Sequence, residues 1–181
     1  LWSRGLGDVY KRQARWIGLE QEIPRRFVED TNWIWYPDEG PVEVIPPGKR
    51  FFRRAFDIPA DREFTDVVLR ITADDSCAIF MDGREIGSRA GGHATKEMDL
   101  TYRMRPGRHV LAVMAENAGA DAGPAGLIAR LQVDFASGDP LVVRADDSWR
   151  TSRDAVSGWQ QPDFDDSRWL PARVLGPVGM A

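Results

Sequence analysis

Apolar and polar residues alternate along much of the chain between residues 50 and 135. In the run DVVLRITAD, Val67, Leu69 and Ile71 fall on one face of an extended segment, and Arg70 falls on the other. The runs HVLAVMAEN and GLIARLQVDF repeat the same period of two. Successive side chains of a β-strand point to opposite faces, so this period predicts strands with one buried face. No segment carries a convincing apolar stripe of helical period, which predicts an all-β fold.

Turn-forming residues separate these apolar runs. Asp82 and Gly83 lie between AIFM and REIG, and both residue types tolerate the positive φ of a type I′ hairpin turn. Pro106-Gly107 precedes another predicted strand, and a Gly and Pro cluster at 138–140 precedes LVVRA. Many short strands separated by such turn residues predict an antiparallel β-sandwich.

The alternation also predicts which residues form the core of the sandwich. Seven apolar residues should be buried together between two sheets: Phe56, Leu69, Ile71, Leu111, Val113, Leu131 and Val133. Their polar neighbours Arg70, Arg130 and Gln132 should face solvent or a partner. A shift of one residue in register would invert every face, so these positions test the whole pattern.

Charge and composition exclude several classes of function. The 181 residues carry a net charge of −4, whereas binding of nucleic acid needs a dense basic face. No apolar run approaches the roughly 18 residues that span a membrane. The single cysteine, Cys77, excludes a disulfide framework and lies in the apolar run CAIFM, which predicts a buried, inert thiol. The two histidines, His93 and His109, have no partners at the spacing of a zinc site.

Pairs of aspartates recur in similar short motifs. The sequence ADDS occurs at 73–76 and at 145–148, and DDS occurs at 165–167. Asp and Ser cap turns by accepting hydrogen bonds from nearby backbone N–H groups, and this is the interpretation we favour. Contact with a ligand or a structural calcium ion is the alternative, and no other cofactor is expected. A catalytic pair is disfavoured, because neighbours in an extended segment point in opposite directions.

Seven tryptophans are present, and their indole faces suit either core packing or stacking against a sugar ring. Trp33 and Trp35 alternate in NWIWY and should share an inward face. Trp149 and Trp169 are also expected in the core. Trp159 lies between Gly158 and two glutamines, so it is the best candidate for an exposed platform.

Several motifs together resemble a known family. They are WIWYPDEG followed by RFFRRAFDIP, then ITADDSCAIFMDGREIG, PGRHVLAVMAENAG, AGLIARLQV and a closing GWQQPDFDDSRWLPARV. These resemble the galactose-binding-like β-sandwich modules of carbohydrate-active enzymes, above all the accessory sandwiches of α-L-rhamnosidase-like hydrolases and the sugar-binding domain of β-galactosidase-type enzymes. The hairpin carries Asp82 where Asn is more usual in this family. The resemblance implies a jelly-roll sandwich.

The resemblance also implies a function. It implies a non-catalytic carbohydrate-binding or accessory module of a larger secreted glycoside hydrolase, periplasmic or extracellular, whose acid and base residues lie in another domain. Its partner would be a carbohydrate or the adjoining catalytic domain of the same chain. The alternative is a structural interdomain sandwich without sugar affinity. A sugar site should lie in loops at the strand ends, where glycines allow close approach. The candidate residues are Asp74, Asp75, Arg89, His93, Asn117 and Trp159.

The domain organisation follows from the ends of these motifs. Residues 3–13, SRGLGDVYKRQ, resemble a translated sequencing-library adapter, so we expect 1–13 to be an artefact outside the domain. Residues 14–30 are expected to be a linker or the end of a preceding domain. Residues 31–181 are expected to form the sandwich with its closing segment, truncated at residue 181.

Overall fold

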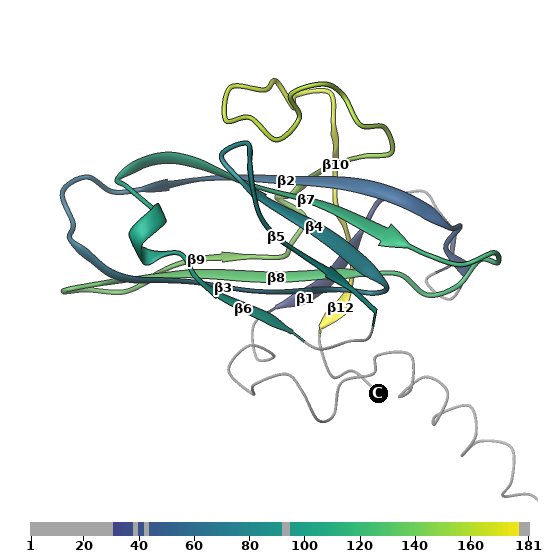
Figure 1. Cartoon of the computed structure of the whole chain (residues 1–181), viewed down its shortest axis with the longest axis horizontal. Coiled ribbons are helices and arrows are strands. Elements are labelled where there is room, and N and C mark those ends of the chain that lie inside the picture. The colour runs from purple at the N-terminus through teal and green to yellow at the C-terminus, as the bar shows by residue number, and fades with distance from the viewer. Residues whose placement is uncertain (1–30, 38–39, 42–43, 92–94, 178–181) are drawn as a thin grey trace, which may run out of the picture.

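The computed structural model describes residues 31–37, 40–41, 44–91, 95–177. Across these residues the regular secondary structure consists of strands and one short 3₁₀ turn (Figure 1). The elements are β1 (Asn32–Trp35), β2 (Gly48–Ile58), β3 (Phe64–Ala73), β4 (Ser76–Met81), β5 (Arg84–Ala90), β6 (Lys96–Asp99), the 3₁₀ turn η2 (Thr101–Arg103), β7 (Gly107–Asn117), β8 (Leu127–Phe135), β9 (Leu141–Arg144), β10 (Arg150–Ser152), β11 (Leu170–Pro171) and β12 (Arg173–Pro177).

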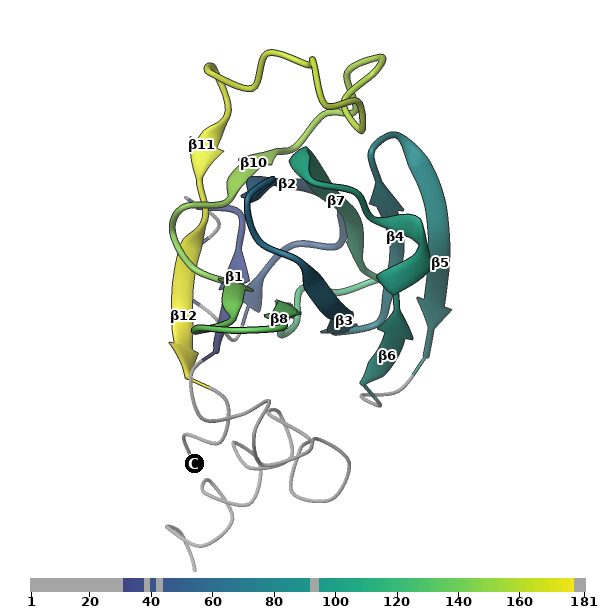
Figure 2. The ribbon, with the colours of Figure 1, turned by 90° about the vertical axis from the view of Figure 1, so that its left-hand side faces the viewer.

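The strands form two antiparallel sheets packed face to face, as Figures 1 and 2 show. One sheet has the order β12-β1-β8-β3-β6, with β9 also paired to β8. The other has the order β11-β10-β2-β7-β4-β5. The predicted antiparallel β-sandwich is therefore confirmed. Its long central pairs, β2 with β7 and β3 with β8, run antiparallel along most of their lengths.

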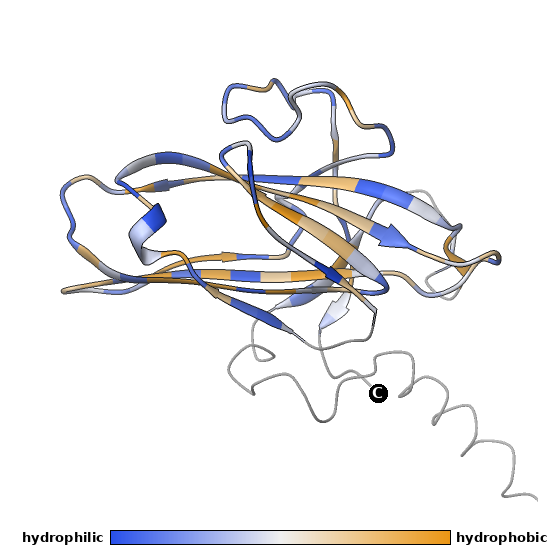
Figure 3. Ribbon diagram, in the orientation of Figure 1, coloured by the Kyte–Doolittle hydropathy of each residue, from blue (hydrophilic) through white to orange (hydrophobic). Residues whose placement is uncertain are grey.

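The core lies between the sheets and contains all seven residues that the alternation predicted. Along β8 the buried positions alternate with half-buried polar ones, so apolar and polar segments follow one another along the strand (Figure 3). On the outer face Arg70 pairs with Glu97 at 2.7 Å, and Arg130 Nη1 donates to Gln132 Oε1 at 2.5 Å. The predicted register is therefore confirmed in β3 and β8.

The hairpin between β4 and β5 has the predicted two-residue turn. Met81 pairs with Arg84, and the intervening Asp82 and Gly83 have φ values of 50° and 80°. Two consecutive positive φ values define a type I′ turn, whose twist matches that of the flanking strands.

The expectation that Trp33 and Trp35 share an inward face is wrong for Trp33. The pairing of β1 with β12 shifts register between Trp33 and Ile34. The residue that this shift skips, Leu175, lies on β12. In β1 itself the neighbours Ile34 and Trp35 are both buried in the core, while Trp33 is half-buried. The ring of Trp33 instead lies against Gly126, where an added Cβ would come within 2.6 Å of it.

A second apolar cluster covers the outer face of the β2 and β7 sheet. The segment between β10 and β11 lies over this face in both views (Figures 1 and 2). It buries five residues together: Phe51, Val110, Ala112, Trp159 and Trp169. The apolar residues on the outer side of β2 and β7 are therefore packed, and the C-terminal segment is an integral layer of the fold.

Candidate functional site

Four segments distant in sequence meet at one end of the sandwich, around the turn between β3 and β4. Asp75 holds the turn with a positive φ of 68°. Its Oδ2 accepts a hydrogen bond from the N–H of Ala118 at 2.6 Å, and its carbonyl accepts one from Gly91 at 2.9 Å. Asp75 thus joins the β3–β4 turn to the β7–β8 loop and to the chain leaving β5. We call this region, with residues 45–46 and 118–126, the strand-end loops.

Asp74 and Asn117 also lie in the strand-end loops. The Asp74 N–H donates to the carbonyl of Gly126 at 2.9 Å, which places Asp74 next to the residue that supports the Trp33 ring. Asn117 is only 4% exposed, and its Nδ2 donates to the carbonyl of Ile45 at 2.9 Å. The amide of Asn117 therefore holds the 45–46 segment in place, and its donor is used within the fold.

Arg89 and Cys77 face each other across β4 and β5. The Arg89 side chain is half-buried, and its Nη1 has no hydrogen-bond partner among the described residues. Burial raises the pKa of the Cys77 thiol to about 11, against smaller opposing effects of nearby cations. A protonated, buried thiol is a poor nucleophile, which agrees with the predicted inert cysteine. His93 lies outside the described residues.

The expectation that Trp159 is exposed is wrong. Its side chain is 5% exposed and belongs to the second apolar cluster. The rings of Phe51 and Phe80 meet it edge-on at centroid distances of 5.1 and 5.5 Å, and Trp169 stacks at 6.3 Å. These neighbours cover the indole face on which a sugar would stack. The indole in turn shields the apolar residues on the outer face of β2 and β7 from water. Trp149 and Trp169 are buried as expected.

A buried arginine that the sequence analysis missed holds this cluster in place. Arg53 is 2% exposed and pairs with Asp166 through Nε at 2.9 Å. Its Nη1 also donates to the carbonyls of Trp159 and Gln161. The planar guanidinium can serve several acceptors at once, so one side chain fixes the loop onto the sheet.

The turn-cap interpretation of the aspartate motifs is confirmed at two of them. Asp146 accepts a hydrogen bond from the N–H of Ser148 at 2.9 Å, and Asp165 accepts one from the N–H of Ser167 at 3.0 Å. This bond is the largest cause that lowers the pKa of Asp165 below its usual value. Among the described residues no group of three or more His, Cys, Asp or Glu could hold a metal ion. The calcium alternative would need backbone carbonyls beside Asp74 and Asp75, and it stays a prediction.

The hairpin residue Asp82 has a second role besides its turn. Its Oδ1 accepts a hydrogen bond from the N–H of Val110 at 2.8 Å, and its Oδ2 accepts one from His109 Nδ1 at 2.6 Å. The other ring nitrogen of His109 lies 2.7 Å from the carbonyl of Arg105, which can only accept. Both nitrogens therefore donate, and the hydrogen bond to Asp82 is the largest cause that raises the pKa of His109.

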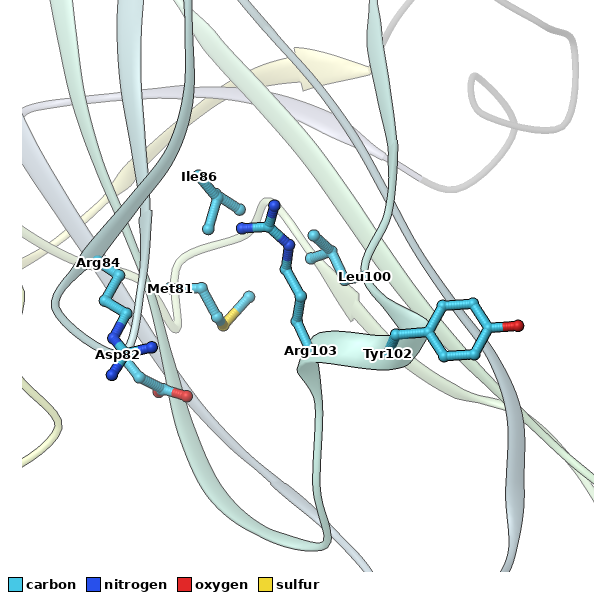
Figure 4. Close-up of a pocket in the computed structure, with 7 residues that line it drawn as sticks. All are labelled: Met81, Asp82, Arg84, Ile86, Leu100, Tyr102 and Arg103. Carbon is cyan, nitrogen blue, oxygen red and sulfur yellow. The ribbon is translucent and has the colours of Figure 1, made fainter.

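A depression with a volume of about 580 Å³ lies beside this hairpin (Figure 4). It lies where the edge strands of the two sheets, β5 and β6, approach the 3₁₀ turn η2. The residues that line it are Met81, Asp82, Arg84, Ile86, Leu100, Tyr102 and Arg103. Arg84 and Arg103 were not singled out in the sequence, although Arg84 directly follows the hairpin turn and Arg103 lies in the arginine-rich run TYRMRPG.

Comparison with known proteins gives the sandwich a context. The chain is 34% identical over 186 aligned positions to an α-L-rhamnosidase of Streptomyces avermitilis, covering 98% of this chain and 18% of the relative. The crystal structure of the S. avermitilis α-L-rhamnosidase complexed with L-rhamnose superposes on 82% of this chain with a TM-score of 0.75 and 34% identity, using 15% of its own chain. This chain is homologous to part of an α-L-rhamnosidase. No family model matches the sequence.

Two further solved structures share the sandwich. A GH78 family rhamnosidase of Bacillus sp. GL1 covers 84% of this chain with 28% identity and a TM-score of 0.69, using 19% of its own chain. A lectin from Pleurotus ostreatus in complex with GalNAc covers 83% with 25% identity and a TM-score of 0.71, using 44% of its own chain. The chain spans 18% of the length of the S. avermitilis relative, so it is homologous to a small β-sandwich part of that enzyme, which fits an accessory module. Within the described residues no helix is long and apolar enough to cross a membrane.

Proposed function

We propose that the chain is a non-catalytic, carbohydrate-binding accessory module of a secreted α-L-rhamnosidase-like glycoside hydrolase. The observation that carries the proposal is the match to a β-sandwich part of a rhamnosidase that covers only 18% of that enzyme. The shared fold with a lectin in complex with GalNAc supports binding of a sugar by such a sandwich. In this proposal hydrolysis is performed by another part of the parent enzyme, and the module acts in the periplasm or outside the cell.

The strand-end loops are the site that we propose for the sugar. The half-buried indole of Trp33 lies against Gly126, and Asp74 is bonded to the same glycine. An aromatic surface beside carboxylates and a guanidinium is the combination by which proteins hold a sugar, since the ring has an apolar face and a rim of hydroxyls. Arg89, on β5 two residues before Gly91, would contribute the guanidinium; its Nη1 is buried and has no hydrogen-bond partner among the described residues.

The second candidate is a structural sandwich that packs against a neighbouring domain. Two of the predicted site residues favour it, because Asp75 and Asn117 form hydrogen bonds that hold the loops together within the fold. A structural role needs no more than this, whereas a sugar site needs polar groups that remain available.

Calorimetric titration of the chain with neutral saccharides, chosen from a glycan array, separates the two candidates. The binding module should show saturable binding that changes little with salt, because neutral sugars carry no charge. Substituting Arg89→Gln should weaken binding about ten-fold, as the loss of one good hydrogen bond does. The matched control, Arg150→Gln, alters an exposed arginine on β10 and should leave binding unchanged. Absence of binding to every saccharide would favour the structural candidate.

A further inference from the structure

The depression beside the β4–β5 hairpin has an apolar floor. Met81 and Leu100 belong to the core cluster that fills the sandwich, and Ile86 packs against that cluster. Met81 and Leu100 are only 6% and 2% exposed, whereas Ile86, on the edge strand β5, is half-buried and supplies most of the apolar surface that a ligand could reach. A pyranose ring has apolar C–H faces, which this floor could cover.

The rim of the depression is positively charged. Figure 4 shows Arg103 extending from η2 with its guanidinium beside Ile86 and Leu100. Arg84 and Arg103 are exposed, and neither forms an ion pair with a carboxylate among the described residues. The one acidic lining residue, Asp82, already accepts hydrogen bonds from Val110 and His109. Two exposed guanidiniums without a carboxylate partner among the described residues therefore lie on the rim, and Figure 4 shows them apart, that of Arg103 beside Ile86 and that of Arg84 on the side of Asp82.

Guanidinium groups bind carboxylates through two parallel hydrogen bonds, which makes arginine well suited to planar anions. Tyr102, beside Arg103 on η2, is 91% exposed and gives the rim an aromatic surface. In Figure 4 its ring points away from Arg103, so it would contact a ligand longer than the depression itself. An apolar floor, two guanidiniums and an outlying aromatic ring fit a chain of sugar units of which one is acidic.

We propose that this depression binds a carboxylate-bearing saccharide, with a uronate ring against Ile86 and its carboxylate on Arg103, and with Arg84 adding positive charge at the rim. The proposal rests on the carbohydrate-binding function proposed above and adds a second, anionic specificity to it. The strand-end loops would take neutral sugar units, and the hairpin depression would take the acidic one.

Calorimetric titration of the whole chain with oligogalacturonate tests the proposal, with methyl-esterified oligogalacturonate and acetate as matched probes. The oligogalacturonate should bind at low salt and weaken as the ionic strength rises, because the attraction is charged. The methyl ester, which has lost the charge, should bind at least about ten-fold more weakly. Acetate, which has the charge without the ring, should show no measurable binding. Equal binding of ester and acid, or of acetate and acid, would overturn the proposal.

Three variants locate the binding. Arg103→Gln should weaken oligogalacturonate binding about ten-fold or more and Arg84→Gln by a smaller factor, while their thermal unfolding stays that of the parent, because both side chains are exposed. Arg168→Gln removes an exposed arginine from the segment over the other sheet face and should change nothing. An equal loss in all three would show general attraction to positive charge and contradict a site. Arg89→Gln separates the two proposals, because it should weaken neutral sugars alone.

Discussion

Truncation of Trp159 to alanine should destabilise the fold strongly and leave sugar binding intact. The side chain is 5% exposed and is held between Phe51, Phe80 and Trp169. A buried aromatic residue removes about 150–250 Å² from water, which corresponds to about 4–6 kcal/mol as an upper estimate. Measured Trp→Ala and Phe→Ala changes in cores cost about 3–5 kcal/mol. We expect a loss in that range.

Urea unfolding followed by fluorescence and circular dichroism measures this loss. The midpoint should fall with little change in slope, and the melting temperature should fall by about 6–20 °C for a domain of this size. Trp159→Phe keeps an aromatic ring in the cluster and should lose much less. A change below about 1 kcal/mol in Trp159→Ala, together with loss of saccharide binding, would refute the reasoning and return Trp159 to the sugar site.

Three further outcomes follow from the structure. The hydrogen bond to Asp82 raises the pKa of His109 in the folded protein. The contact therefore stabilises the fold below about pH 6.5, and this stabilisation is lost as the pH rises through the raised pKa. In urea unfolding across pH 5–9, His109→Gln should flatten this pH dependence. Leu111→Ala should lower the free energy of unfolding by about 2–5 kcal/mol, and a neutral result would place Leu111 outside the core. Gly83→Ala should cost about 1–2 kcal/mol in the same assay because the φ of Gly83 is positive, and a stabilised variant would contradict the type I′ turn.

Periodicity predicted the inner faces of β3 and β8 because each strand has one buried and one polar face. It failed in β1, where the neighbours Ile34 and Trp35 are both buried in the core and Trp33 is only half-buried. It also failed for the outer cluster. The run HVLAVMA, and the neighbours Phe51 and Phe52 in RFFRRAF, place apolar residues on both faces of a strand, which is typical of a strand covered on both sides. That pattern could have predicted a covering layer, but it does not say which segment supplies it.

The candidate site was predictable only in part. The strand-end loops meet because antiparallel strands bring their turns to the same end of a sandwich, so Asp74, Asp75 and Asn117 are neighbours as expected. Sequence could not tell which of their polar atoms are used within the fold, because this depends on distances between loops. The hydrogen bond between Asp82 and His109 joins residues 27 positions apart, so it could not be predicted from the sequence either.

Mapping of backbone amide shifts by ¹H–¹⁵N NMR during titration with L-rhamnose and other neutral saccharides tests the central proposal most directly. It reports each amide of the chain separately and so locates binding without a prior choice of variant. The account predicts saturable shifts in the turn at 74–76 and the loop at 118–126, with none in the segment at 157–169 that carries Trp159. Shifts confined to 157–169, or no shifts with any saccharide, would contradict carbohydrate binding at the strand-end loops.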